Sequence, residues 1–228
     1  KLLFESYYTL GRIDLPHPQA SATKAYTSMA LGRAIQLGYL TMADLDKPLQ
    51  YFLKELNVAR FAKGAASITL HHALTMCTGI SISDAQIEAF YKEPAPLQGQ
   101  AQVQVFLEQT EPITPARQTF DYKYDPTLVM QVIEAVVPDT AEEFIKTELL
   151  DKLGIANYKW PIDELNGLPR SGSHSRMTSR DMIKWGTLAL YTGKWNGEHL
   201  IPEAFIDKST SRLLLTGDDD IFGGGKDV

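Results

Sequence analysis

A serine and a lysine stand three residues apart where the chain could make a hydroxyl reactive. Ser21 and Lys24 open an apolar segment that runs to Leu40. On a helix, residues i and i+3 share a face, so the hydroxyl and the amine would point the same way. A serine becomes nucleophilic when a neighbouring base takes its proton, and a desolvated neutral lysine can be that base. The pair therefore predicts nucleophilic chemistry on Ser21.

The spacing alone is weak evidence. A chain with this many serines and lysines gives about one Ser-x-x-Lys match by chance, and a serine before an apolar helix is commonly only its N-cap. The context favours the functional interpretation. This is the only such tetrapeptide in the sequence, and it follows a proline-containing turn at residues 15–18 and a segment, residues 2–8, that reads as a strand.

The element that would position the pair is a helix from Ser21 to Leu37. Its apolar residues recur at three- and four-residue steps, and Gly38 stands where a left-handed C-cap belongs. Further helices are predicted at 70–79 with Thr69 as N-cap, at 127–137, and at 182–191 with Thr178 or Ser179 as cap. Residues 81–119, interrupted by prolines, are predicted to be irregular. Asn196-Gly197 predicts a tight turn.

The segment from Leu3 to Leu40 resembles the serine β-lactamase and penicillin-binding-protein-like superfamily, in particular its class C-like serine hydrolases and family VIII-type esterases. The matching residues are Gly11, His17, Pro18, Ser21, Thr23, Lys24 and Gly38. The resemblance implies an α+β fold of the β-lactamase/transpeptidase type, with an antiparallel sheet flanked by helices and a mostly helical lobe. The expected lobes are 1–50 with 165–228, carrying an incomplete sheet, and 51–164, with loops that roof the cleft.

The resemblance also nominates a third catalytic residue. Pro115, Phe120 and Tyr122 match the frame of the superfamily's second motif, whose tyrosine faces the serine. A tyrosine that shares a proton with Lys24 can act as general base in acylation and return the proton to the leaving group. Its pKa near 10 must fall for this, and a nearby ammonium group is the natural cause. The alternative is that Tyr122 is one of ten tyrosines and is simply packed.

Two further residues are expected to contact the substrate. Tyr124 stands where β-lactamases carry an asparagine that binds the substrate's amide, which favours ester, amide or peptide substrates over β-lactams. His174 lies in a predicted loop at the rim of the cleft. A Ser-His scheme is disfavoured because the chain has no Gly-x-Ser-x-Gly elbow.

One expected motif is missing. Superfamily members carry a later Lys-Thr-Gly or His-x-Gly segment on an edge strand that supplies an oxyanion N–H, and no such segment precedes Val228. Losing one such donor costs about 10²- to 10³-fold in rate. We therefore expect the natural protein to be longer, or residues outside this sequence to supply the rest of the sheet. The alternative function is a catalytically inactive binding or scaffold protein.

The composition limits the kinds of molecule that the protein is expected to bind. A net charge of −6 argues against nucleic acid and anionic membranes, and no segment reaches the roughly 18 apolar residues that span a bilayer. The single Cys77 excludes an internal disulfide, and His71 and His72 lack acids or cysteines at ligand spacing. We expect a small-molecule or peptide substrate, with no metal and no cofactor, and leave the oligomeric state open. The resemblance suggests a periplasmic or secreted protein and leaves a cytoplasmic one open.

Overall fold

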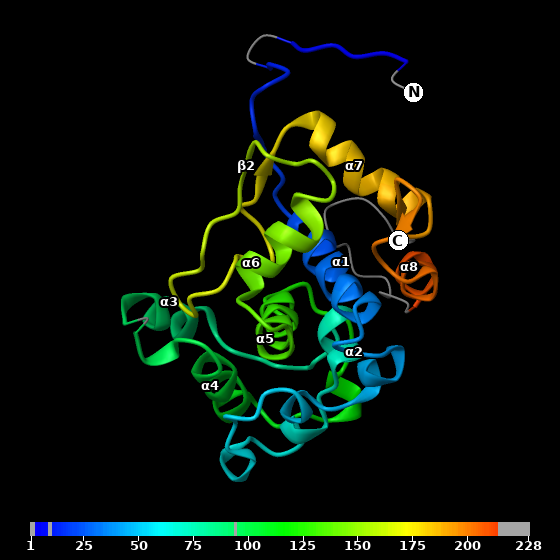
Figure 1. Cartoon of the computed structure of the whole chain (residues 1–228). Coiled ribbons are helices and arrows are strands. Elements are labelled where there is room, and N and C mark those ends of the chain that lie inside the picture. The colour runs from blue at the N-terminus through cyan, green and yellow to red at the C-terminus, as the bar shows by residue number, and fades with distance from the viewer. Residues whose placement is uncertain (1–2, 9–10, 94, 214–228) are drawn as a thin grey trace.

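Helices dominate the chain in the computed structural model, which describes residues 3–8, 11–93 and 95–213 (Figure 1). The α-helices are α1 Ala22–Gln36, α2 Leu70–Leu74, α3 Asp84–Lys92, α4 Ala101–Gln109, α5 Pro126–Val136, α6 Ala141–Ile145, α7 Ser179–Leu190 and α8 Glu203–Thr210. Short 3₁₀ turns are η1 Met42–Asp46, η2 Leu49–Tyr51, η3 Val58–Arg60, η4 Ala65–Ser67, η5 Ala95–Leu97 and η6 Pro115–Arg117, and α6 continues into a π-turn, η7 Lys146–Leu150.

Helix α1 is the element on which the others pack. It ends as predicted at Gly38, which has a left-handed φ of 81°. The N–H of Gly38 bonds the carbonyl of Ile35 at 3.0 Å, and the N–H of Tyr39 bonds that of Ala34 at 3.0 Å. In Figure 1, α1 runs through the middle of the molecule and packs on α5, whose first turn begins with Pro126.

The strands form two small antiparallel sheets. In the first, β3 (Arg176–Met177) lies between β1 (His17–Pro18) and β2 (Tyr158–Lys159). The second is a hairpin of β4 (Lys194–Trp195) and β5 (Glu198–His199), closed by the predicted Asn-Gly turn. Asn196 and Gly197 have φ of 49° and 86°, the left-handed pair such a turn requires.

Three sequence expectations need correction. The helix predicted at 70–79 ends at Leu74, because Met76 adopts a left-handed φ of 53° that a helix cannot contain. Residues 3–8 form no strand, because a strand needs a hydrogen-bonded neighbour and none of the described residues pairs with this segment. Residues 81–119 are more regular than predicted, because they hold α3 and α4. Ser83 caps α3 by accepting the N–H of Gln86 at 3.3 Å, and Gln86 reaches back to the N–H of Ser83 at 3.0 Å.

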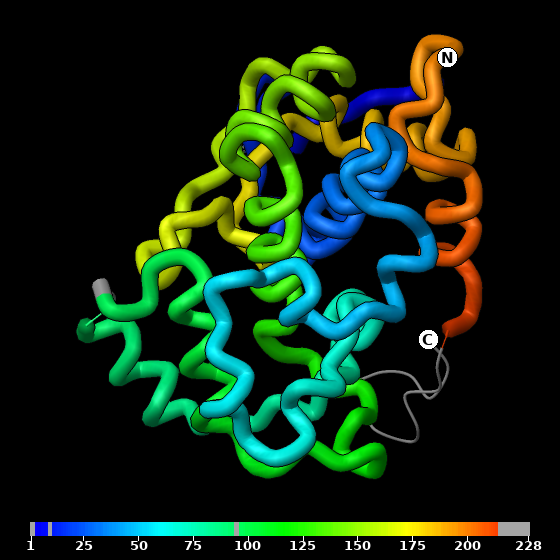
Figure 2. The backbone as a smooth tube through the Cα atoms, turned by 60° about the horizontal axis from the view of Figure 1, so that its bottom comes forward, coloured from blue at the N-terminus to red at the C-terminus, as the bar shows by residue number. Residues whose placement is uncertain are grey.

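A single hydrophobic cluster runs through the described chain, from Tyr26 in α1 to Ile206 in α8. Its largest fully buried side chains include Trp185 and Phe106. The two views agree that the early and late parts of the chain meet around α1 (Figures 1 and 2). The cluster draws on both expected lobes, whose boundaries stay a prediction. In the part of the chain that the structure describes, no helix combines the length and apolarity that crossing a bilayer demands.

Candidate active site

A sharp backbone turn presents Ser21 at the start of α1. Strand β1 ends at Pro18, and two residues later Ala20 adopts a left-handed φ of 44°, which is unfavourable for alanine. Ser21 then occupies the N-cap position with a helical φ of −71° and ψ of −9°, and its hydroxyl caps none of the helix N–H groups. The side chain is exposed. Ser21 is therefore not a capping serine in this fold.

Lys24 lies one turn along α1, on the same face as Ser21. Its Nζ donates to Ser21 Oγ at 3.4 Å and to the carbonyl oxygen of Gly172 at 2.8 Å. The same Nζ stands 4.5 Å from the ring centroid of Tyr122. The structure thus brings together the three residues predicted to be catalytic, although Tyr122 is about a hundred positions from the other two.

The environment of Tyr122 moves its pKa in the direction that base catalysis needs. Partial burial raises the pKa of this phenol, but hydrogen bonding with Ser21 and Lys24 and the charge of Lys24 outweigh burial, so the pKa lies below its ordinary value of 10. A phenol with a lowered pKa beside a serine hydroxyl can accept the hydroxyl proton.

The loop of residues 171–175 clasps α1 beside this cluster. The buried Thr23 hydroxyl lies 2.8 Å from that of Ser175, and Thr27 donates to the carbonyl of Ser171 at 2.9 Å. Together with the bond from Lys24 to Gly172, these contacts fix the loop along two turns of the helix. The sequence indicated a flexible loop here, and only the small and hydroxyl-bearing residues at these positions hinted at close packing against a helix.

A buried glutamine holds the strand that leads into Ser21. Gln19 donates from Nε2 to the carbonyls of His17 at 2.9 Å and Met177 at 3.3 Å, and its Oε1 accepts the hydroxyl of Tyr26 at 2.9 Å. The Tyr26 ring stacks on Trp185 with centroids 4.7 Å apart. Polar and aromatic contacts thus anchor both ends of the turn at Ala20, and sequence reasoning missed them.

The two predicted substrate-contacting residues lie outside the cluster. Tyr124 is turned away, because its hydroxyl accepts the N–H of Ile82 at 3.0 Å and donates to the carbonyl of Ile80 at 3.3 Å, while its ring packs on Phe106. His174 is exposed at the tip of the clasping loop, with a left-handed φ of 74°, and borders a separate hollow.

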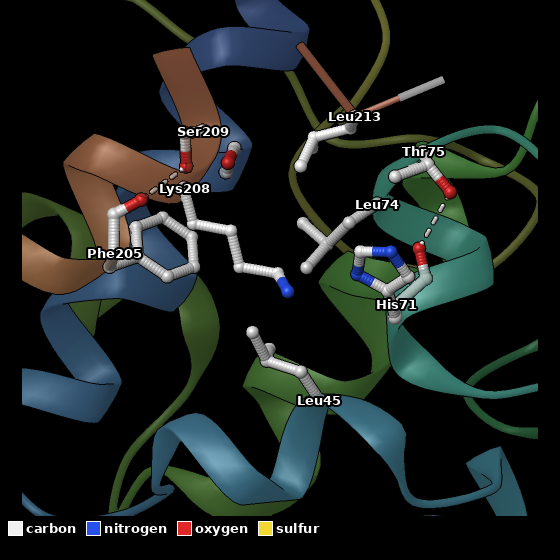
Figure 3. A pocket seen from close by; sticks show the side chains of 9 residues that line it. Leu45, His71, Leu74, Thr75, Phe205, Lys208, Ser209 and Leu213 are labelled. Carbon is white, nitrogen blue, oxygen red and sulfur yellow. Dashed lines mark hydrogen bonds between the residues drawn. The ribbon is translucent and has the colours of Figure 1, made fainter. Parts of the chain in front are cut away.

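A second hollow of about 100 Å³ lies between α1, α2 and α8 and contains none of the three clustered residues (Figure 3). It is lined by Ser28, Leu45, His71, Leu74, Thr75, Phe205, Lys208, Ser209 and Leu213. Two of the lining hydroxyls hydrogen-bond to carbonyls of their own helices. Thr75 donates to the carbonyl of His71 at 2.9 Å, and Ser209 donates to that of Phe205 at 2.7 Å. The neighbouring His72 accepts the N–H of Thr69 at 3.1 Å. Across the described residues, no group of three or more potential metal ligands comes together.

Comparison with known proteins places this geometry in a family. The beta-lactamase family model matches residues 12–227. No curated protein matches the sequence.

Solved structures show the same fold. A protein described as a beta-lactamase from Bacteroides dorei superposes with a TM-score of 0.73 at 17% identity, covering 91% of this chain and 60% of that one. A D-stereospecific amidohydrolase from Streptomyces superposes with a TM-score of 0.62 at 17% identity, and the match covers 88% of this chain and 66% of that one. A class C beta-lactamase from Rhodobacter sphaeroides superposes with a TM-score of 0.62 at 18% identity, and the match covers 86% of this chain and 57% of that one. The chain thus spans 57% to 66% of the length of these three structures.

Proposed function

Because the chain belongs to the beta-lactamase family and has its β-lactamase/transpeptidase-like fold, we propose that it is a serine hydrolase that forms an acyl-enzyme on Ser21. One observation carries the proposal. The amine of Lys24 lies 3.4 Å from the hydroxyl of Ser21 and 4.5 Å from the ring centroid of Tyr122, at the N-terminus of a buried helix.

In this mechanism Ser21 Oγ attacks the carbonyl carbon of the substrate and its proton passes to the Tyr122 oxygen. The charge of Lys24 stabilises the phenolate before this transfer. The tetrapeptide lies at the positive end of the α1 dipole, and the backbone N–H of Ser21 supplies one donor to the developing oxyanion. The proton then moves to the leaving group as the bond breaks. Water then attacks the ester on Ser21 and gives a proton to Tyr122. Tyr122 passes this proton to Ser21 Oγ as the acyl–oxygen bond breaks, which releases the acid and restores the serine.

Ester, amide or peptide bonds fit this site better than β-lactams. The position two residues after Tyr122 is Tyr124, whose hydroxyl is occupied by the backbone of Ile80 and Ile82. It presents no side-chain amide to hydrogen-bond an acylamino group. A periplasmic or secreted location is part of the same proposal and follows from the family resemblance.

The test is covalent labelling. The protein is incubated with a fluorophosphonate probe, and separately with a p-nitrophenyl ester, and adducts are located by intact and peptide mass spectrometry. We expect one adduct on Ser21 that is lost in Ser21→Ala. Ser28→Ala, two turns along the same helix, is the matched control and should label normally. A folded protein that labels nowhere, or labels equally in Ser21→Ala, contradicts the proposal and favours the inactive binding protein.

A further inference from the structure

A hollow of about 600 Å³ opens on the outer face of the β1-β3-β2 sheet. It is lined by Pro18, Lys159, Trp160, Pro161, His174 and Arg176. Three of these residues carry a basic nitrogen, and three present apolar surface. The chain as a whole has a net charge of −6, so this concentration of basic groups is a local exception.

The strand register sets two of the cations opposite each other. Arg176 in β3 pairs with Pro18 on one side and Lys159 on the other, so the three residues form a row across the sheet. Like charges at directly opposed positions destabilise a sheet. Neither Lys159 nor Arg176 forms an ion pair with any residue that the structure describes. The fold thus keeps an unfavourable pair without a compensating carboxylate.

The apolar wall beside these cations is held firmly. The indole Nε1 of Trp160 donates to the carbonyl of Arg170 at 2.7 Å, and its ring meets the edge of Tyr26 at a centroid distance of 6.2 Å. His174 also lines the hollow, and its Nδ1 hydrogen-bonds the hydroxyl of Ser173. A rigid wall with a few charges at its edge is typical of small-molecule subsites.

The hollow shares two segments with the Ser21 cluster. Pro18, which lines it, is three residues before Ser21. His174, on its rim, lies between Gly172, which accepts a hydrogen bond from Lys24, and Ser175, whose carbonyl accepts the N–H of Gln19 at 2.9 Å. A ligand in the hollow would therefore lie next to the segments that carry the nucleophile and its base.

We propose that this hollow is a subsite for a carboxylate on the substrate, an inference that rests on the proposed hydrolase function. The guanidinium of Arg176 and the ammonium of Lys159 supply charge-assisted hydrogen bonds to the carboxylate. The faces of Pro18, Trp160 and Pro161 cover the hydrocarbon chain that links it to the scissile bond. The preferred substrates are then acidic esters or amides.

The kinetic test compares three esters. The p-nitrophenyl half-ester of glutaric acid carries a carboxylate on its acyl part, 3-carboxyphenyl valerate carries one on its leaving group, and p-nitrophenyl valerate has neither. In Lys159→Gln/Arg176→Gln we expect kcat/KM to fall about tenfold or more for at least one acidic ester and to change less than about twofold for the neutral one. Lys54→Gln/Lys194→Gln removes the same charge elsewhere and should leave all three unchanged.

A binding measurement separates this inference from the hydrolase proposal. Ser21→Ala is titrated with glutarate by NMR, and binding should disappear when Lys159→Gln and Arg176→Gln are added, and weaken at high salt. If no ester is hydrolysed but glutarate binds in this way, the hydrolase proposal fails and the carboxylate site stands. The subsite proposal is wrong if the double substitution lowers kcat/KM equally for acidic and neutral esters. It is also wrong if glutarate binds equally well with and without the two substitutions.

Discussion

At Tyr122 two opposing effects act on the pKa of one phenol. Burial raises the pKa, and the hydrogen bonds and charge contributed by Ser21 and Lys24 lower it further than burial raises it. A base works in its deprotonated form, so the rate should rise with pH through an apparent pKa below 10. The lowered pKa therefore moves activity toward neutral pH.

We expect Tyr122→Phe to lower kcat/KM by about a hundredfold or more and to remove this rise from the pH profile, because positioned acid-base groups contribute about 10²- to 10⁴-fold. The measurement is kcat/KM for a p-nitrophenyl ester from pH 6 to pH 10. Tyr51→Phe is the control, since Lys47 lies 3.9 Å above the centroid of that ring, far from Ser21 in the chain. An unchanged profile in Tyr122→Phe would remove the phenol from the mechanism.

The grouping of Ser21, Lys24 and Tyr122 was predictable from the sequence, while the residues that hold this group in place were not. Ser21 and Lys24 are local, and helix periodicity is enough to put them on one face. Gln19, Gly172 and Ser175 act through bonds between segments about 150 positions apart, and no periodicity reports such a contact. Tyr124 was expected to contact the substrate because of its place in a motif. The motif did not reveal that backbone groups of Ile80 and Ile82 would occupy its hydroxyl.

At the scale of the helix, Gly32 allows α1 to approach α8 closely. A Cβ at this position would lie 2.7 Å from Ile201 Cγ2 and 2.8 Å from Phe205 Cδ1, both in buried side chains. Alanine favours a helix by about 1 kcal/mol over glycine, but overpacking a core costs about 1–3 kcal/mol.

We therefore expect Gly32→Ala to destabilise the protein by about 1–2 kcal/mol, measured by urea unfolding. Gly186→Ala in α7 is the matched control, because a Cβ there has no neighbour within 4 Å. That variant should be stabilised by up to about 1 kcal/mol through helix propensity alone. Equal effects of the two alanines would contradict the packing argument.

The N-cap position of α5 holds a buried acid, Asp125. Asp125 is 3% exposed, and burial raises its pKa to about 7, although its Oδ2 accepts the N–H of Thr78 at 3.3 Å. The folded state holds this proton more tightly than the unfolded chain does, so stability falls as pH rises from about 4 through about 7. Above pH 7 the buried charge costs a few kcal/mol, at about 1.4 kcal/mol per unit of pKa.

We expect Asp125→Asn to raise the free energy of unfolding at pH 8 by about 2–4 kcal/mol and to change it little at pH 4, because the amide is neutral and can still accept from Thr78. Unfolding curves at both pH values provide the check. Asp207→Asn, an exposed acid in α8, should change neither. A destabilising effect of Asp125→Asn at pH 8 would show that the charge is used by the fold.

The prolines within residues 81–119 explain why α3 and α4 were not predicted from the sequence. Pro96 falls between α3 and α4, and Pro112 follows α4. These prolines therefore separate helices, whereas in the sequence they suggested an irregular run. The capping pair Ser83 and Gln86 was the missed signal. By contrast, α1, α5 and α7 followed from apolar periodicity and caps, because each buries one long face.

Over the whole molecule, Arg33 joins three parts of the chain. Its side chain is 3% exposed and its Nη2 lies 2.6 Å from Glu148 Oε2 in η7. Its Nη1 donates to the carbonyl of Leu200 at 3.2 Å, just past the β4-β5 hairpin. The guanidinium of Arg33 thus links α1 both to η7, which continues α6, and to Leu200 in the late part of the chain.

Without Glu148, the buried charge keeps only the more distant carboxylate of Glu198, whose Oε1 lies 3.8 Å from Nη2. We expect Glu148→Gln to cost about 3 kcal/mol of unfolding free energy, and Arg33→Met/Glu148→Gln to recover part of that loss because no charge stays buried. Glu143→Gln, which breaks an exposed contact with Lys146 at 3.8 Å, should cost less than about 1 kcal/mol. Chemical denaturation of the four proteins decides, and equal costs for the two glutamines would rule out a special role for Arg33.

The clasp between α1 and residues 171–175 has a consequence for the order of events during synthesis. Gly172 and Ser175, which fix the helix that carries Ser21, are made about 150 residues after it. Contacts of such long sequence separation form late in folding. The helix that carries Ser21 is therefore complete long before residues 171–175 can pack against it, so the activity proposed for Ser21 should be acquired late in the folding reaction.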